Sequence, residues 1–149
     1  GDVRPLAEVS VTAMTHKAFE VLELERDLLK QDEFYVFTWQ YRGQHEGQNE
    51  GGEGGDIHAP KPFKAYDLID PKITFETNDL DGVIEITLAA EALALFVTLD
   101  ADQPGRFSAN AVTLLPNVPQ KIIFVPQDTD INTNFTVQNL YKATLGGAK

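Results

Sequence analysis

The chain of 149 residues contains no cysteine, so disulfide bonds and cysteine-based zinc sites are excluded. It also lacks any apolar run close to the roughly 20 residues that a membrane-spanning helix needs. Basic residues are scarce: 12 lysines and arginines stand against 23 aspartates and glutamates, for a net charge of -11. Because nucleic-acid phosphates and acidic lipids would repel such a chain, we expect neither nucleic acid nor a membrane as a partner. Sugars and other protein surfaces remain as partner classes.

The composition is otherwise that of an ordinary globular protein, with 42% hydrophobic and 23% charged residues. This length accommodates one large β-sandwich, or one small domain plus part of another. The sequence starts at Gly1-Asp2-Val3 without an initiator methionine, which favours a processed chain or a piece of a longer one.

Short alternating apolar patterns dominate the region after residue 60. Ile84, Ile86 and Leu88 share one face of a predicted strand, and Leu95, Val97 and Leu99 repeat the pattern. Further strands are predicted around residues 73–75, 111–115, 121–125 and 135–141. Turn residues separate them at 78–82, 102–105, 116–119 and 126–130. This spacing indicates an all-β, antiparallel sandwich or barrel, without the alternation of strands and helices that a parallel sheet requires.

The region before residue 60 is less regular. Strands are predicted at residues 9–14, 19–24 and 34–41, with a short helical turn at 26–30. Residues 42–56 are rich in glycine and glutamate and contain no large apolar side chain, so we expect a flexible acidic loop there.

Four aromatic residues, Tyr35, Phe37, Trp39 and Tyr41, recur at every second position of the predicted strand and therefore share one face. Such a ladder can stack against the C–H faces of pyranose rings, which makes it a candidate sugar-binding surface. Aromatic residues on a strand face more often pack inside a sandwich, and we favour that interpretation.

Motifs for other chemistry are weak or missing. The stretch from Asp100 to Gly105 begins like a calcium loop, but Pro104 and Ala111 occupy positions that need oxygen ligands, so a turn is the better interpretation. The three histidines, His16, His45 and His58, lack metal-ligand spacing. There is no nucleophile elbow, phosphate loop or dinucleotide fingerprint. We therefore predict no catalytic, cofactor-binding or metal-binding residue in this chain.

Three stretches follow one another in a distinctive order: an aliphatic strand at Ala94–Asp100, a Gly-Arg-Phe-Ser-Ala-Asn turn ending at Asn110, and a Leu-Leu-Pro segment within Thr113–Phe124. This order resembles the C-terminal immunoglobulin-like domain of β-mannosidases of the family-two glycoside hydrolase type. The resemblance covers about residues 60–145. One departure is Ala109, where that family usually has aspartate.

The resemblance implies an immunoglobulin-like sandwich at residues 60–149. Residues 1–59 would then be the closing strands of a preceding β-sandwich, including the acidic loop, and are too few to form a complete sandwich. The parent enzyme would be a retaining β-mannosidase that releases terminal β-D-mannose with two glutamates on a (β/α)-barrel. No such barrel is encoded in this chain.

The same resemblance implies an accessory role, with the rest of the parent glycosidase, or another chain of that enzyme, as partner. A mannose-containing oligosaccharide is a second expected partner, and a carbohydrate-binding module or a generic adhesion sandwich are the alternative functions. We expect a secreted, periplasmic or lysosomal protein rather than a cytoplasmic one.

The residues that carry the resemblance have structural roles in this interpretation. Gly105 is expected to supply a turn conformation that a side chain would oppose. Phe107 would close one end of the sandwich, and Asn110 would hydrogen-bond backbone groups across the turn. Pro116 would prevent ladder extension between two strands. The motif therefore marks a fold rather than an active site.

Overall fold

The computed structural model describes residues 5, 33–45, 48–128 and 132–144, with the side chains of 41–54 excepted. The predicted elements at residues 9–14, 19–24 and 26–30 lie outside this part of the chain. The chain divides into two compact units, Arg4–Asp67 and, for the larger one, Leu68–Lys149.

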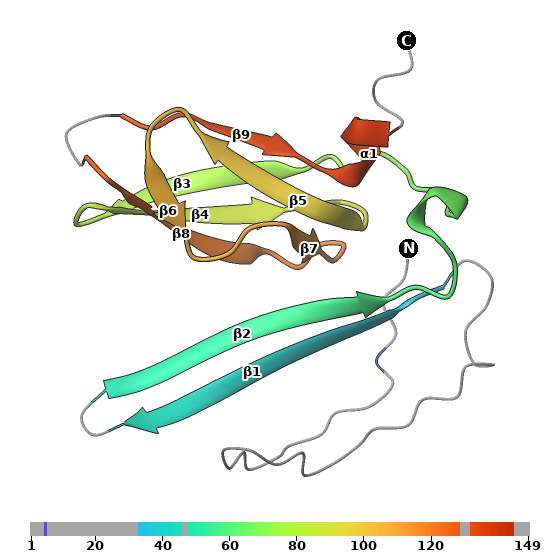
Figure 1. Cartoon of the computed structure of the whole chain (residues 1–149), viewed down its shortest axis with the longest axis horizontal. Coiled ribbons are helices and arrows are strands. Elements are labelled where there is room, and N and C mark those ends of the chain that lie inside the picture. Colours follow the sequence, from blue (N-terminus) through green and yellow to red (C-terminus); the bar gives the residue numbers. More distant parts are fainter. Residues whose placement is uncertain (1–4, 6–32, 46–47, 129–131, 145–149) are drawn as a thin grey trace. The chain divides into compact units, whose positions relative to one another are not determined.

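The first unit contains a long antiparallel hairpin of β1 (Tyr35–His45) and β2 (Gln48–His58) (Figure 1). The prediction of a loop over residues 42–56 is therefore wrong, because all described residues of that segment pair in the hairpin. Glycine contributes no side chain to a core, but its backbone N–H and C=O pair like those of any other residue. The glycine-rich composition of residues 42–56 thus argues against a buried apolar face, but it does not argue against a strand.

After β2 the chain forms a single 3₁₀ turn at Phe63–Ala65, labelled η2. Tyr66 follows it and is buried, with its ring 4.7 Å from the ring of Phe34 and the Lys61 ammonium 4.5 Å from its centroid. The proline-rich stretch before η2 is thereby anchored by aromatic contacts within its own unit.

The second unit consists of two antiparallel sheets. The larger sheet has the order β3-β4-β8-β6 and the smaller has the order β7-β5-β9. The strands of the larger sheet are β3 (Thr74–Leu80), β4 (Val83–Ala89), β8 (Gln120–Pro126) and β6 (Gly105–Phe107). Those of the smaller sheet are β7 (Val112–Leu114), β5 (Ala94–Ala101) and β9 (Phe135–Gln138). Figure 1 shows the two sheets as layers of one body.

The core lies between these sheets. Ile86 and Leu88 from β4 and Ile122 and Phe124 from β8 are at most 1% exposed, and they cluster with residues of the smaller sheet. The smaller sheet contributes Ala94, Val97, Leu99 and Leu114. The alternating apolar positions of β4 thus point inward, as their spacing predicted, and so do Val97 and Leu99 of β5. Leu95 is buried too, but the register shift between Ala94 and Val97 puts Ala94 rather than Leu95 in this cluster. The all-β class and the antiparallel sandwich are confirmed.

Several boundaries differ from the sequence-based expectation. The turn predicted at residues 78–82 is confined to Asp81 and Gly82, because β3 continues to Leu80 and β4 begins at Val83. The predicted turn at residues 102–105 ends one residue early, because Gly105 already pairs with Pro126 in β6. The strand predicted for 135–141 ends at Gln138, and helix α1 (Leu140–Thr144) follows. Asn139 explains the change: its Oδ1 accepts a hydrogen bond from the Lys142 N–H at 3.0 Å, which is a helix N-cap.

Within the described residues, no helix combines the length and the apolar character that crossing a membrane requires.

Candidate functional site

The aromatic ladder lies on β1 of the hairpin. Tyr35 is buried at 6% exposure, whereas Phe37 is 37% exposed and Trp39 is 50% exposed. The rings of Tyr35 and Phe37 lie 6.3 Å apart. The structure therefore joins the first two members of the ladder and leaves Trp39 at the surface; for Tyr41 it describes only the backbone.

The cross-strand register shows what lies opposite these rings. Phe37 pairs with Asp56, Trp39 with Gly54 and Tyr41 with Gly52. Directly opposite residues of an antiparallel pair share a face, so glycines place only backbone beside the exposed Trp39 position. Aromatic rings commonly cover such glycines in sheets, which gives the arrangement a structural explanation as well as a sugar-stacking one.

Gly105 is required by packing rather than by its backbone angle. Its φ is not in the left-handed region, so the expected turn role is wrong. A Cβ atom at this position would overlap ring carbons Cζ and Cε2 of Phe124 and come within 2.8 Å of the Val125 carbonyl oxygen. Only glycine lets β6 approach β8 this closely.

Phe107 belongs to an aromatic cluster between the sheets. Its ring lies 4.7 Å from Phe124 and 6.1 Å from Phe135, and the last two rings meet edge to face at 5.3 Å. Such tilted and edge-to-face arrangements are the favourable ones for aromatic pairs. These three residues come from β6, β8 and β9, so the cluster joins the larger sheet to the smaller one.

Asn110 acts as a substitute strand partner. Its Oδ1 accepts a hydrogen bond from the Leu99 N–H at 2.9 Å, and its Nδ2 donates to the Leu99 carbonyl at 3.0 Å. The register of β5 and β7 pairs Ala94 with Leu114 and Val97 with Val112, so Asn110 continues this ladder by means of its side chain. The hydrogen bond expected of Asn110 is present.

Pro116 lies in the connection from β7 to β8. The Val118 N–H donates to the Leu115 carbonyl at 3.2 Å, and Asn117 between them has a φ of 58°. Proline followed by a residue with positive φ is the pattern of a type II turn. Asn117 also donates its N–H to the carbonyl of Ala90 at 2.8 Å, which ties this turn to the corner between β4 and β5.

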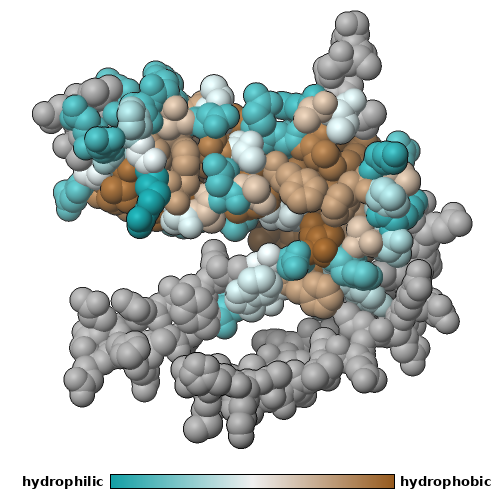
Figure 2. All heavy atoms as spheres, in the orientation of Figure 1, coloured by the Kyte–Doolittle hydropathy of each residue, from teal (hydrophilic) through white to brown (hydrophobic). Residues whose placement is uncertain are grey.

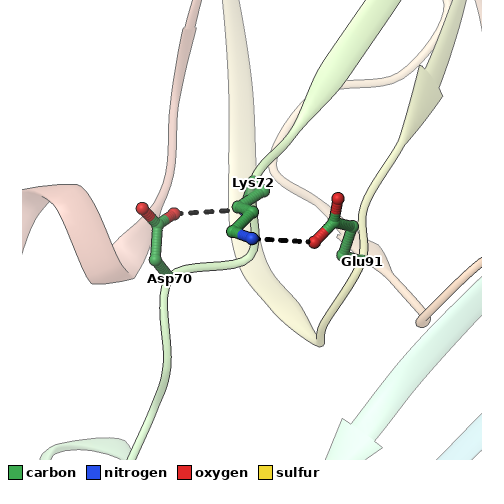
Figure 3. Close-up of polar contacts among 3 residues, drawn as sticks. All are labelled: Asp70, Lys72 and Glu91. Atoms are coloured by element: carbon green, nitrogen blue, oxygen red, sulfur yellow. Dashed lines mark hydrogen bonds and ion pairs between the residues drawn. The ribbon is translucent and has the colours of Figure 1, made fainter.

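The same corner is held on its other side by the segment that leads into β3. Lys72 forms an ion pair with Glu91 at 3.2 Å, and its N–H donates to Asp70 Oδ1 at 3.1 Å (Figure 3). The Glu91 N–H donates to the Pro71 carbonyl at 2.9 Å. Both partners of the ion pair are well exposed, so its contribution to stability is small. These charges therefore act locally, at the corner between β4 and β5.

Asp102 and Asn134 form a link that sequence reasoning missed. Asn134 donates its N–H to Asp102 Oδ1 at 2.9 Å and its Nδ2 to Oδ2 at 2.6 Å, and the Asp102 N–H donates to the Asn134 carbonyl at 3.1 Å. The side-chain bond from Asn134, followed by the backbone bond, lowers the pKa of Asp102. Asp102 was expected in a turn, Asn134 lies outside the predicted turns, and 32 positions separate the two residues.

These polar groups act on the fold. A carboxyl with a lowered pKa stays ionised and is unsuited to the general acid of glycoside hydrolysis, which needs a raised pKa. In the part of the chain that the structure describes, no group of three or more His, Cys, Asp or Glu side chains could hold a metal ion.

Comparison with known proteins gives one family. The family model Ig_mannosidase, described as an Ig-fold domain, matches residues 68–143, which is just over half of the chain. The match begins where the second compact unit begins and contains β3 to β9. No curated protein matches the chain.

Proposed function

The chain belongs to the Ig_mannosidase family of Ig-fold domains, and on this premise we propose that it is the non-catalytic accessory sandwich of a β-mannosidase. The immunoglobulin-like sandwich is the part that the family assignment covers. The finer proposal is that the parent enzyme is a retaining glycoside hydrolase that releases terminal β-D-mannose. In it, this sandwich would pack on the catalytic barrel and stabilise it.

One observation supports the accessory role: polar side chains of the motif that ends at Asn110 form hydrogen bonds with the backbone of neighbouring strands. Asn110 satisfies the backbone of Leu99, and the Ser108 hydroxyl accepts the N–H of Ile123 at 2.9 Å. A catalytic or ligand-binding residue would direct such groups toward a substrate. The motif therefore supports a scaffold rather than a reaction centre.

The first unit supports a related proposal, in which residues 1–59 close a preceding β-sandwich. Among the residues that the structure describes, β1 and β2 pair only with each other, and two strands by themselves are marginally stable in water. Phe37 and Trp39 are substantially exposed on this hairpin. Both features fit a hairpin that further strands of a longer polypeptide, or of another chain, would complete.

Two preparations test the accessory role. The isolated chain and the protein encoded by the complete reading frame around it are each incubated with an aryl β-mannoside. We expect hydrolysis by the complete protein and none by the isolated chain, because the general acid and the nucleophile would reside on the barrel. Turnover by the pure isolated chain would refute the accessory role. A complete protein without a glycosidase domain would refute the β-mannosidase assignment.

A second candidate function is carbohydrate binding by the hairpin. The half-exposed ring of Trp39 opposite Gly54 favours it, since a flat exposed indole beside bare backbone can accept a pyranose face. Trp39 is the single tryptophan of the chain, so its fluorescence reports on this position alone.

Titration with manno-oligosaccharides separates the two functions. Sugar stacking would quench Trp39 fluorescence in a saturable way, and Phe37→Ala would weaken the binding. Val125→Ala, at a similarly exposed position on β8 of the other unit, is the matched control. Unchanged fluorescence across the titration would eliminate the binding module.

A further inference from the structure

Asn134, Phe135 and Thr136 form a triplet at the start of β9 whose first and third residues match a modification motif. Asparagine followed two positions later by serine or threonine, with a residue other than proline between them, is the acceptor motif for N-linked oligosaccharides. This motif occurs once in the 149 residues. An oligosaccharide is bulky, so the motif can be used only where the folded chain leaves the asparagine amide at the surface.

The triplet meets this condition because side chains alternate along a strand. Asn134 and Thr136 are exposed, whereas Phe135 between them is partly buried and packs in the aromatic cluster with Phe107 and Phe124. Among the described strands, β9 pairs only with β5 and therefore forms an edge of its sheet. An oligosaccharide on Asn134 would extend from this edge without displacing any side chain of the core.

The side-chain amide of Asn134 can be modified without losing its link to Asp102. Its Nδ2 donates to Asp102 Oδ2 at 2.6 Å, and a carboxamide nitrogen carries two hydrogens. Attachment of a sugar replaces one hydrogen and leaves the other as a donor. The backbone N–H of Asn134, which bonds to Asp102 Oδ1, takes no part in the modification. The structural role of Asn134 and a role as an acceptor are therefore compatible.

The surroundings of the triplet also suit a sugar. Thr136 lies opposite Asp100 and Gln138 lies opposite Thr98. Figure 2 shows hydrophilic side chains over the end of the sandwich where β9 begins. A neutral oligosaccharide is not repelled by a chain of net charge -11, and its hydroxyl groups can donate hydrogen bonds to nearby carboxylates.

We propose that Asn134 is a site of N-linked glycosylation, whose donor is an oligosaccharide carried on a polyprenyl diphosphate in a eukaryotic secretory pathway. A bond forms from Asn134 Nδ2 to the anomeric carbon of the first sugar, and the bond from that carbon to the phosphate oxygen breaks. The polyprenyl diphosphate leaves with the bonding electrons, and the amide proton passes to a base of the transferase. The inference requires the secreted or lysosomal location expected above, and it is independent of β-mannoside hydrolysis.

Protein isolated from its natural source gives the direct test. Trypsin cleaves after Lys121 and Lys142, and the resulting peptide of residues 122–142 contains the triplet. An amidase that removes N-linked oligosaccharides in water labelled with heavy oxygen converts a glycosylated asparagine into labelled aspartate. We expect the label at Asn134 and none at Asn132 or Asn139, and a digest without the amidase is the control. A peptide without label at Asn134 would overturn the inference.

Variants of the full chain, secreted from eukaryotic cells, separate recognition of the motif from the structural role of Asn134. Thr136→Val removes the hydroxyl, keeps Asn134 beside Asp102 and suits a strand, so it should abolish the oligosaccharide mass. Thr136→Ser keeps the hydroxyl and should retain that mass. Thr77→Val, at an exposed position of β3, is the matched control and should be modified like wild type. An unmodified wild-type chain, or a modified Thr136→Val chain, would contradict the inference.

Discussion

At Asn110 a side-chain amide takes the place of a strand partner, because a carboxamide presents one acceptor and one donor with the spacing of a peptide group. Both of its bonds go to Leu99, whose side chain is buried in the core. Gly105 serves the same region differently, by leaving room for the ring of Phe124. Each residue type thus follows from one contact within the fold.

Replacing Asn110 should weaken the sandwich. Asn110→Ala removes both bonds to Leu99, and we expect the free energy of unfolding to fall by about 1–2 kcal/mol in urea titrations. Asn110→Asp keeps the acceptor and loses the donor, so it should lie between wild type and Asn110→Ala. The neighbouring Ala109→Ser is the control and should leave the unfolding midpoint unchanged. Equal stability of Asn110→Ala and wild type would show that water replaces the amide.

Between elements, the link of Asp102 and Asn134 joins the end of β5 to the segment before β9. Asn134 donates two hydrogen bonds to the Asp102 carboxylate, one from its backbone N–H and one from its side chain, and its carbonyl accepts one from the Asp102 N–H. The ionised carboxylate accepts at both oxygens, whereas protonation turns one oxygen into a donor and removes the charge that strengthens both bonds. The link between the two elements should therefore depend on pH.

The sign of this dependence follows from the lowered pKa of Asp102. A carboxyl whose pKa is lower in the folded state than its ordinary value of 3.8 stabilises the fold above that value, and the stabilisation is lost as the pH falls through the folded-state pKa. The difference in unfolding free energy between wild type and Asp102→Ala should therefore shrink below about pH 4. Urea titrations from neutral to acidic pH measure it.

The control for this experiment is Asp67→Asn, which removes one exposed carboxylate without touching Asn134. The stability difference between Asp67→Asn and wild type should not follow the titration seen with Asp102→Ala. A constant difference between wild type and Asp102→Ala over the whole acidic range would contradict the role of the ionised carboxylate.

At the scale of the whole molecule, the hydrophobic core of the second unit is contained within that unit. Its buried cluster draws on β4, β5, β7 and β8, all within Leu68–Lys149. The family match falls in the same stretch. This coincidence of core, compact unit and family match indicates that the sandwich is an independent folding unit.

A fragment of Leu68–Lys149 should accordingly fold alone. We expect a single cooperative urea transition with near-ultraviolet circular dichroism from its packed aromatic cluster. Phe124→Ala in the same fragment should cost about 3–5 kcal/mol, because it empties the centre of that cluster. A broad, non-cooperative transition of the unmodified fragment would mean that its core depends on residues before Leu68.

Sequence alone predicted the all-β class, the inward face of β4, the inward positions of Val97 and Leu99 on β5, and the bonding of Asn110 to backbone groups. Those features depend on period-two patterns and turn residues, which are local. Only the tertiary structure shows four other features. They are the pairing of the glycine-rich β2, the packing reason for Gly105, the Asp102–Asn134 link and the positive φ of Phe96. Each of these depends on contacts between residues far apart in the chain or on a shift in strand register, and neither leaves a signature in neighbouring residues.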